Sequence, residues 1–119
     1  MAATAAKQQA NRWPALLDAA AQLFAMHGYH ETTIRDVAVA AGVTPGALYF
    51  HVPTKQALLV AVYAEGVDRI IGKMEAAVSY ETDPVLRLRR AIAAHLESIL
   101  DASAFARVIV RVLPEDVPE

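Results

Sequence analysis

The chain has 119 residues, with 11 lysines and arginines against 13 aspartates and glutamates, which gives a formal net charge of −2. It contains no cysteine, so disulfides, thiol catalysis and thiolate metal sites are excluded. No apolar run reaches the roughly 18 residues of a membrane helix, and the opening lacks the apolar core of a signal peptide. A cytoplasmic protein is therefore expected. The alanine-rich composition, 55% hydrophobic, predicts an all-α fold.

The first predicted helix covers residues 13–27. Pro14 suits its first turn, where a missing N–H costs nothing, and Gly28 ends it. Residues 1–11 are small and polar, which predicts a flexible arm that either reaches a nearby phosphate through its basic residues or has no role. One side of the helix is expected to carry Leu16, Leu17, Ala20, Leu23, Phe24 and His27, and a solvated or capping role is expected for His27. His27 and His30 straddle its end, so no metal site is expected there.

Two short helices separated by a tight turn follow. Thr33 is a good N-cap for a helix that begins at Ile34, and Asp36 can complete a capping box with it. Gly42 supplies the left-handed conformation that ends this helix without a Cβ penalty. The expected buried face is Ile34, Val37, Ala38 and Ala41.

The second short helix is predicted to run from Pro45 to about His51, with Thr44 as its N-cap. Two short helices joined by a turn of about three or four residues with a glycine form a helix-turn-helix motif, whose second helix enters the DNA major groove. Its outward face carries little bulk at the start, which lets the backbone approach a phosphate or a base edge. That face is expected to contain Thr44, Pro45, Gly46, Ala47, Tyr49 and Phe50 or His51.

Residues 32–59, TTIRDVAVAAGVTPGALYFHVPTKQALL, resemble the N-terminal DNA-binding domain of TetR-family transcriptional regulators. The similarity includes the tail Leu-Tyr-x-His-x-x-x-Lys that ends at Lys55, and with the preceding helix it covers roughly the first half of the chain. One departure is Val52, where the family commonly has Phe. The resemblance implies that DNA is contacted by Thr33, Arg35, Thr44, Gly46, Ala47, Tyr49, His51 and Lys55, and Pro45 belongs to the same surface.

These positions have expected roles and simpler alternatives. The expected phosphate contacts come from Thr33, Tyr49, His51 and Lys55, and the expected contacts to base edges or thymine methyl groups come from Arg35, Thr44 and Ala47. In the simpler reading the two threonines only cap helices and Tyr49 packs against the protein. Arg35 would then pair with Glu31 or Asp36.

Three further helices are predicted after the motif. A long one, capped by Thr54, runs to about Ser79, with Gly66 and Gly72 as weak points. The next, capped by Asp83, has an apolar stripe of Val85, Leu88, Ile92, Leu96 and Ile99. Beside that stripe Arg87, Arg89 and Arg90 form either an anion site or a solvated face that pairs with acids such as Glu97 and Asp101. The last, capped by Ser103, carries Phe105, Val108, Ile109, Val112 and Leu113 and stops at Pro114.

The expected organisation is a helix-turn-helix domain over residues 12–56 and the first helices of an incomplete ligand-binding and dimerisation domain over residues 57–119. The apolar faces of the later helices are larger than these helices can cover by packing on one another, and an exposed apolar patch of this kind normally marks an interface. Residues 1–56 carry a net charge of 4 − 3 = +1, and residues 57–119 carry 7 − 10 = −3. Since the DNA-binding half is only weakly basic, a dimer is expected to supply part of its affinity.

By resemblance the protein is expected to be a ligand-responsive repressor, not an enzyme, that binds a palindromic DNA operator as a homodimer without a cofactor. The homodimer would form mostly through segments beyond this chain. The expected effector is small and apolar, and its lining residues would be Val62, Tyr63, Ile70, Met74, Leu96, Phe105 and Ile109, each of which core packing explains equally well. The alternative is a helical ligand-carrying or protein-interaction module that has lost DNA binding.

Overall fold

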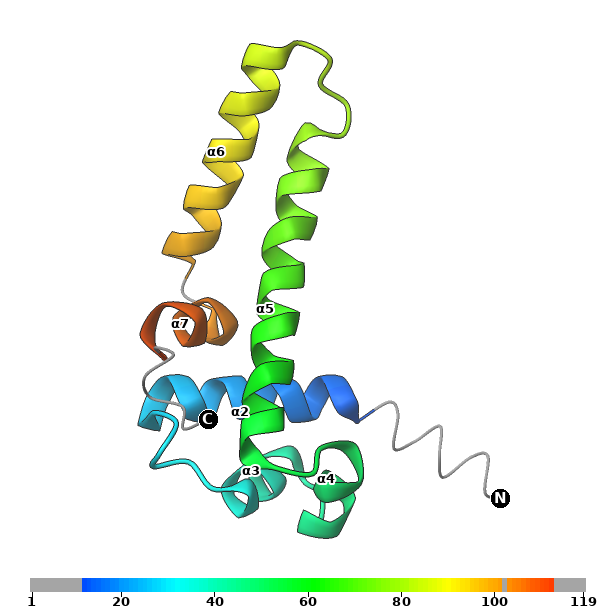
Figure 1. The fold of residues 1–119 in the computed structure, drawn as a ribbon, viewed down its shortest axis with the longest axis vertical. Helices are drawn as coiled ribbons and strands as arrows, with labels where there is room; N and C mark the ends of the chain where they lie inside the picture. The colour runs from blue at the N-terminus through cyan, green and yellow to red at the C-terminus, as the bar shows by residue number, and fades with distance from the viewer. Residues whose placement is uncertain (1–11, 102, 113–119) are drawn as a thin grey trace, which may run out of the picture.

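The computed structural model describes residues 12–101 and 103–112, and in these ranges the protein is all-α. The helices are α2 (Trp13–His27), α3 (Ile34–Ala41), α4 (Pro45–His51), α5 (Lys55–Val78), α6 (Pro84–Leu100) and α7 (Ala104–Arg111). Figure 1 shows α5 and α6 as a tall antiparallel pair above a base of α2, α3 and α4, with α7 beside α5 and directly above α2. The predicted arm at residues 1–11 and the stop at Leu113 and Pro114 lie outside the described residues. Within the described part of the chain, no helix combines the length and apolar character needed to cross a membrane.

The helices begin where the capping residues predict. Hydroxyl or carboxylate oxygens accept hydrogen bonds from backbone N–H groups of the first turn, and each satisfies a donor that the helix itself cannot. The capping residues are Thr33, Thr44, Thr54, Asp83 and Ser103. The two predicted glycine stops are also confirmed, because Gly28 and Gly42 have φ values of 84° and 71°.

The base has one core, built from the inner faces of α2, α3, α4 and the first two turns of α5. Its fully buried members include Leu16, Phe24, Val37, Leu48, Leu58 and Val62. His27, which ends α2, is exposed, as expected for a solvated or capping histidine. The ring of Tyr29, past the Gly28 turn, packs 5.8 Å from the ring of Phe24.

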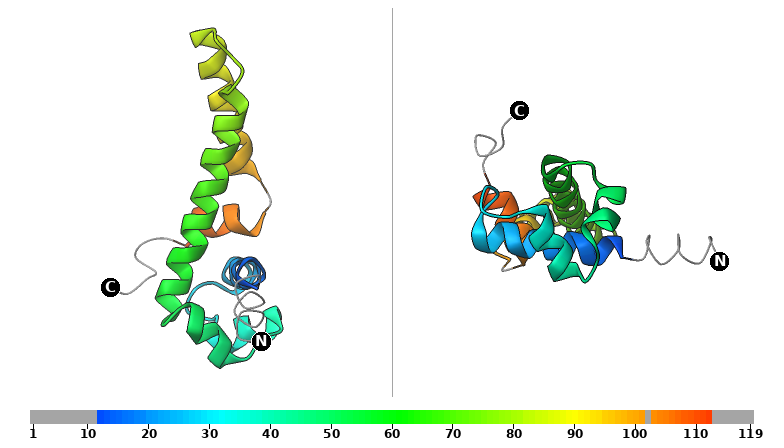
Figure 2. Two further views of the ribbon diagram at one scale, coloured as in Figure 1. Left: turned by 90° about the vertical axis from the view of Figure 1, so that its right-hand side faces the viewer. Right: turned by 90° about the horizontal axis from the view of Figure 1, so that it is seen from below.

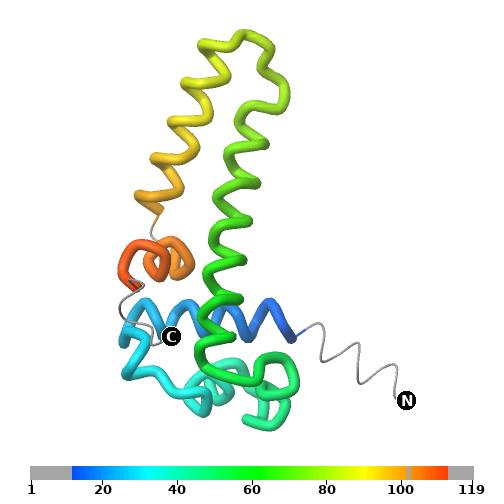
Figure 3. The backbone as a smooth tube through the Cα atoms, in the orientation of Figure 1, coloured from blue at the N-terminus to red at the C-terminus, as the bar shows by residue number. Residues whose placement is uncertain are grey.

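Helix α7 belongs to this core as much as to the α5–α6 pair. Phe105, Val108 and Val112 are buried in the same cluster as the residues of α2 and α5. The side view in Figure 2 and the tube in Figure 3 show α7 seated between the long hairpin and α2. The helix was predicted, but its packing against α2 was not, because no local pattern in the sequence encodes it.

Gly66 also differs from its prediction as a weak point of α5. It is buried where α7 crosses, and an added Cβ would lie 2.6 Å from Ile109 Cδ1 and 3.6 Å from Phe105 Cβ. The glycine is therefore what allows α7 to approach α5 closely. At Gly72, two turns later, an added Cβ would meet nothing within 4 Å.

The apolar stripe of α6 is exposed, contrary to a simple amphipathic prediction. Ala94 and Ser98 are the buried positions of this helix, and the Ser98 hydroxyl donates to the Ala94 carbonyl at 2.9 Å. Small residues allow α6 to pack closely on α5, which leaves the larger apolar side chains outside. The exposed side chains are Val85, Leu88, Ile92, Leu96 and Ile99, with Val67 and Ile71 of α5.

The arginines of α6 pair mostly at the turn before their own helix. Arg87 donates to the carbonyls of Val78 and Glu81, and Arg90 forms an ion pair of 3.2 Å with the Glu81 carboxylate. Glu97 and Asp101, the acids named from the sequence, are not their partners, and Asp101 binds Lys73 instead. These contacts support the solvated-face reading of the arginine cluster.

Candidate nucleic-acid interface

Helix α4 lies on the outside of the base with one buried side chain, Leu48. Each residue of an α-helix turns by about 100°, so Gly46 and Phe50 point about 160° away from Leu48, and Ala47 and Tyr49 flank them. Thr44, Pro45, Gly46, Tyr49 and Phe50 are all exposed, and Ala47 is half-buried. The prediction that a slim helix stands on the exterior of the molecule is therefore confirmed.

The start of α3 lies on the same side of the base. Thr33 and Asp36 form the predicted capping box through two hydrogen bonds of 3.1 Å, each from a backbone N–H to the other residue's side chain. Hydrogen bonding to the side chain and then to the backbone N–H of Thr33 lowers the pKa of Asp36. Arg35 is exposed and makes no ion pair with Glu31, Asp36 or any other described residue. Its guanidinium is thus available to DNA.

Tyr49 and His51 differ in their surroundings. The Tyr49 side chain is 52% exposed, so packing against the protein does not account for it. The His51 ring stacks on Trp13 at 5.4 Å between centroids and meets the Phe50 ring edge at 5.7 Å. This contact joins the end of α4 to the start of α2, and it could not be predicted from local patterns because the two residues are far apart along the chain.

Lys55 is also held by the protein. Its Nζ donates to the Tyr29 carbonyl at 2.8 Å and lies 4.2 Å from the centre of the Tyr29 ring. An ammonium group has three N–H donors, so two remain for a phosphate. Lys55 therefore has a structural role beside the predicted phosphate contact.

Thr32 was not predicted to matter, yet it sets the geometry before α3. The residue is buried, and its hydroxyl reaches the Gly28 carbonyl at 2.8 Å and the Leu23 carbonyl at 3.2 Å. These contacts hold the α2–α3 connection against the end of α2. A threonine directly before the capping threonine was the available signal.

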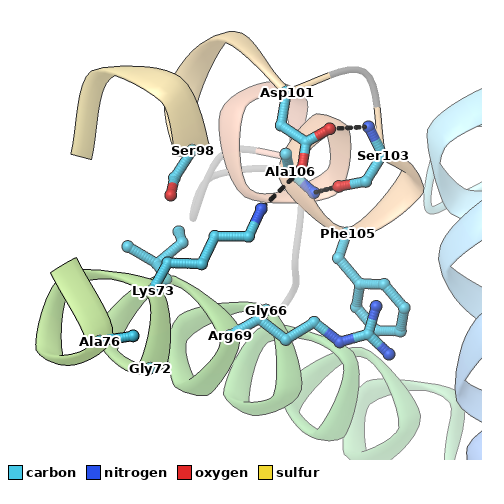
Figure 4. A pocket seen from close by; sticks show the side chains of 11 residues that line it. Gly66, Arg69, Gly72, Lys73, Ala76, Ser98, Asp101, Ser103, Phe105 and Ala106 are labelled. Carbon is cyan, nitrogen blue, oxygen red and sulfur yellow. Dashed lines mark hydrogen bonds and ion pairs between the residues drawn. The ribbon is translucent and has the colours of Figure 1, made fainter. Parts of the chain in front are cut away.

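A second candidate site is a cavity of about 450 Å³ between α5 and the junction of α6 with α7 (Figure 4). Of the seven predicted lining residues, Ile70 and Phe105 line it. Val62 is fully buried in the base and Leu96 is exposed on α6, while Met74 and Ile109 do not line the cavity. Tyr63 instead joins α5 to α7, with its hydroxyl at the carbonyls of Val108 and Val112.

The cavity wall carries two cations that the prediction of an apolar site did not include. Figure 4 shows the Lys73 side chain reaching Asp101 and the Arg69 guanidinium against the Phe105 ring. Lys73 Nζ lies 3.1 Å from Asp101 Oδ2, and Arg69 Cζ lies 4.0 Å from the centre of the Phe105 ring. The Lys73 contact, followed by the backbone N–H of Ser103, lowers the pKa of Asp101. The rest of the lining is mostly small or apolar, so the cavity combines an apolar floor with a charged wall.

Comparisons with known proteins fit this geometry. The family model "Bacterial regulatory proteins, tetR family" matches residues 16–62, which span most of α2, all of α3 and α4, and the start of α5. The chain belongs to the TetR family. The TetR-family model describes regulatory proteins and not enzymes.

Individual relatives agree with the TetR assignment. The chain is 33% identical over 99 residues to the HTH-type transcriptional repressor KstR2 of Mycolicibacterium smegmatis, a match that covers 83% of this chain and 48% of the relative. Among solved structures, the fatty acid degradation regulator FadR of Bacillus halodurans superposes with a TM-score of 0.79 at 28% identity, over 88% of this chain and 56% of that one.

A second solved structure contains both a small molecule and DNA. AibR, described in complex with isovaleryl coenzyme A and operator DNA, superposes with a TM-score of 0.71 at 29% identity, over 84% of this chain and 55% of that chain. The present chain spans about half the length of the curated relatives it matches.

Proposed function

We propose that the protein is a sequence-specific DNA-binding transcriptional regulator that acts as a ligand-responsive repressor. The observation that carries this proposal is the exposed helix α4, which has small residues at its N-terminal turn and projects from the base opposite the buried Leu48. A helix presented in this way fits the major groove, where its side chains and backbone reach base edges and phosphates.

The two proposed functions belong to consecutive parts of the chain. Residues 12–56 would bind DNA, and residues 57–119 would begin a ligand-binding and dimerisation domain. Two copies of the weakly basic DNA-binding half, related by a two-fold axis, would bind the two halves of a palindromic operator about one helical turn apart. The proposed DNA contacts remain Thr33, Arg35, Thr44, Pro45, Gly46, Ala47, Tyr49, His51 and Lys55.

DNA binding is tested by selecting duplexes from a random library with the full-length protein and measuring their affinity at several salt concentrations. Lys55→Gln removes the charge while retaining a side-chain N–H donor. Since each protomer would lose one phosphate contact, the slope of log affinity against log salt is expected to fall by about two for the dimer. Arg89→Gln, which alters an exposed arginine on α6, is the matched control and should leave the slope unchanged.

Two results would count against the proposal. An unchanged salt slope for Lys55→Gln would refute the proposed contact between Lys55 and a phosphate. A wild-type dimer that selects no DNA at low and at physiological salt would favour the alternative, a helical ligand-carrying or protein-interaction module that has lost DNA binding.

For the effector we propose a small apolar acyl group joined to an anionic group. The cavity supports this class because Ile70, Phe105 and Ala76 offer apolar surface and Lys73 lies on the same wall. Its volume of about 450 Å³ is in the range of small-molecule sites. An anion would compete with Asp101 for Lys73, and so would alter the link between α5 and the α6–α7 junction.

Calorimetry with isovaleryl coenzyme A, isovalerate and uncharged isovaleramide tests the effector class. We expect the anionic probes to bind more tightly than the amide. Lys73→Met is expected to weaken their binding by about tenfold or more, as the loss of a charge-assisted hydrogen bond would. Arg107→Met, a change at an exposed residue outside the cavity, is the control. Equal binding of the amide and the anions would reject the anionic class.

A further inference from the structure

Phe50 stands out among the residues of α4. Its side chain is 74% exposed, although burial of a large aromatic ring is normally favourable. The sequence placed either Phe50 or His51 on the outward face of α4, and His51 was the one predicted to contact DNA. The structure places His51 against Trp13, which leaves Phe50 as the outward aromatic side chain at the end of α4.

The direction of Phe50 follows from helix geometry. Phe50 and Gly46 share the face of α4 that lies about 160° from the buried Leu48, so this face projects farthest from the base. Gly46 has no side chain, and Ala47 beside it has only a methyl group. In a groove that accepts α4, the Phe50 ring would therefore extend farther than any other side chain on that face.

The position of the ring is supported from one side. Its edge meets the His51 ring at 5.7 Å with an interplanar angle of 85°, and His51 in turn stacks on Trp13 at 5.4 Å. This row of three rings connects the outermost face of α4 to the start of α2. A side chain held in this way loses less conformational entropy when it binds than a freely rotating one.

The chemistry of the ring limits what it can contact. Phenylalanine has no hydrogen-bond donor or acceptor, so it cannot bind a phosphate as the tyrosine beside it can. The apolar feature that distinguishes one base pair from another in the major groove is the C5-methyl group of thymine, and phenylalanine is among the side chains that contact it.

We infer that Phe50 is a specificity-determining residue that packs against a thymine methyl group in each half of the operator. This inference rests on the proposed DNA-binding function. It assigns sequence preference to the C-terminal turn of α4, in addition to the contacts expected from its N-terminal turn.

The test is a methyl-deletion experiment on the duplex selected by the full-length wild-type protein. Each thymine is replaced in turn by deoxyuridine, which removes only the methyl group and keeps the base pair. At one position in each half-site, the wild-type affinity is expected to fall by about fourfold, the factor that corresponds to one buried CH₂-sized group. At that position Phe50→Ala should bind the thymine and deoxyuridine duplexes equally, with an unchanged salt slope.

Tyr80 provides the control for this experiment. Tyr80→Ala removes an aromatic side chain that is 96% exposed at the far end of the α5–α6 hairpin, and it should keep the wild-type response to deoxyuridine. Because Phe50 is mostly exposed, circular dichroism of Phe50→Ala should match that of the wild type. If wild type and Phe50→Ala respond alike to every methyl deletion, the contact is refuted although the regulator function stands. If the wild type selects no duplex, the function fails and the contact fails with it.

Discussion

The crossing of α7 over Gly66 gives a quantitative prediction, because α5 contains a matched glycine. Gly66→Ala and Gly72→Ala each gain up to about 1 kcal/mol from the better helix propensity of alanine. At Gly72 the new methyl group meets nothing within 4 Å, so we expect this variant to be more stable than the wild type.

At Gly66 the same change introduces a clash. The new Cβ would lie 2.6 Å from Ile109 Cδ1 and 3.4 Å from Ile109 Cγ1, and overpacking of this kind typically costs about 1–3 kcal/mol. The propensity gain is common to both variants and cancels. The free energy of unfolding of Gly66→Ala should therefore be lower than that of Gly72→Ala by about 1–3 kcal/mol.

Ile109→Val provides the decisive cross-check, because it removes the Cδ1 atom that makes the shortest contact. Alone it should cost about 0.5 kcal/mol, the low end for this change, since Ile109 is only half-buried. Combined with Gly66→Ala it should recover most of the lost stability. Urea unfolding followed by far-UV circular dichroism measures all four free energies. Equal stabilities of Gly66→Ala and Gly72→Ala, or a difference that Ile109→Val leaves intact, would refute the argument.

Three further predictions concern the connections around this core. Thr32→Val should lower the free energy of unfolding by about 1–2 kcal/mol, because it removes the buried hydroxyl that donates to the Gly28 carbonyl; an unchanged urea midpoint would contradict this. Since the folded-state pKa of Asp36 is lowered, its contribution to stability is present above the ordinary pKa of 3.8 and is lost as the pH falls through the lowered value; Asp36→Asn should show a flatter decline in urea midpoint between pH 5 and pH 2, about the range in which carboxylates titrate. Tyr63→Phe should speed hydrogen exchange of the α7 amides, because it removes a hydroxyl that binds the carbonyl of Val108 in α7 and that of Val112 at its C-cap, and equal exchange would argue against that tether.

The elements that could be predicted from the sequence are those fixed by local chemistry. A hydroxyl three residues before a backbone N–H forms a cap, and a glycine with positive φ ends a helix. The start of α3 at Ile34, the end of α3 before Gly42 and the exposed position of α4 are confirmed for this reason. The TetR-like string extended these local signals to a family, and the comparisons confirm the family.

The contacts that escaped prediction join residues that are distant along the chain. Nothing local indicates that Trp13 stacks on His51, or that Lys55 donates to the Tyr29 carbonyl. The same holds for α6, where periodicity correctly found an apolar stripe but could not show that Ala94 and Ser98 would face α5 instead. In each case three-dimensional packing decided among side chains that were equally plausible as neighbours.

The placement of α7 affects how this protein could be recombined with others. Because Phe105, Val108 and Val112 complete the core against α2, a chimera cut after residue 56 would leave an apolar gap at the graft point. The portable unit is discontinuous in sequence, and comprises residues 12–62 together with residues 104–112. A scaffold that accepts α4 would therefore have to supply a helix that fills the position of α7, or receive α7 together with α4.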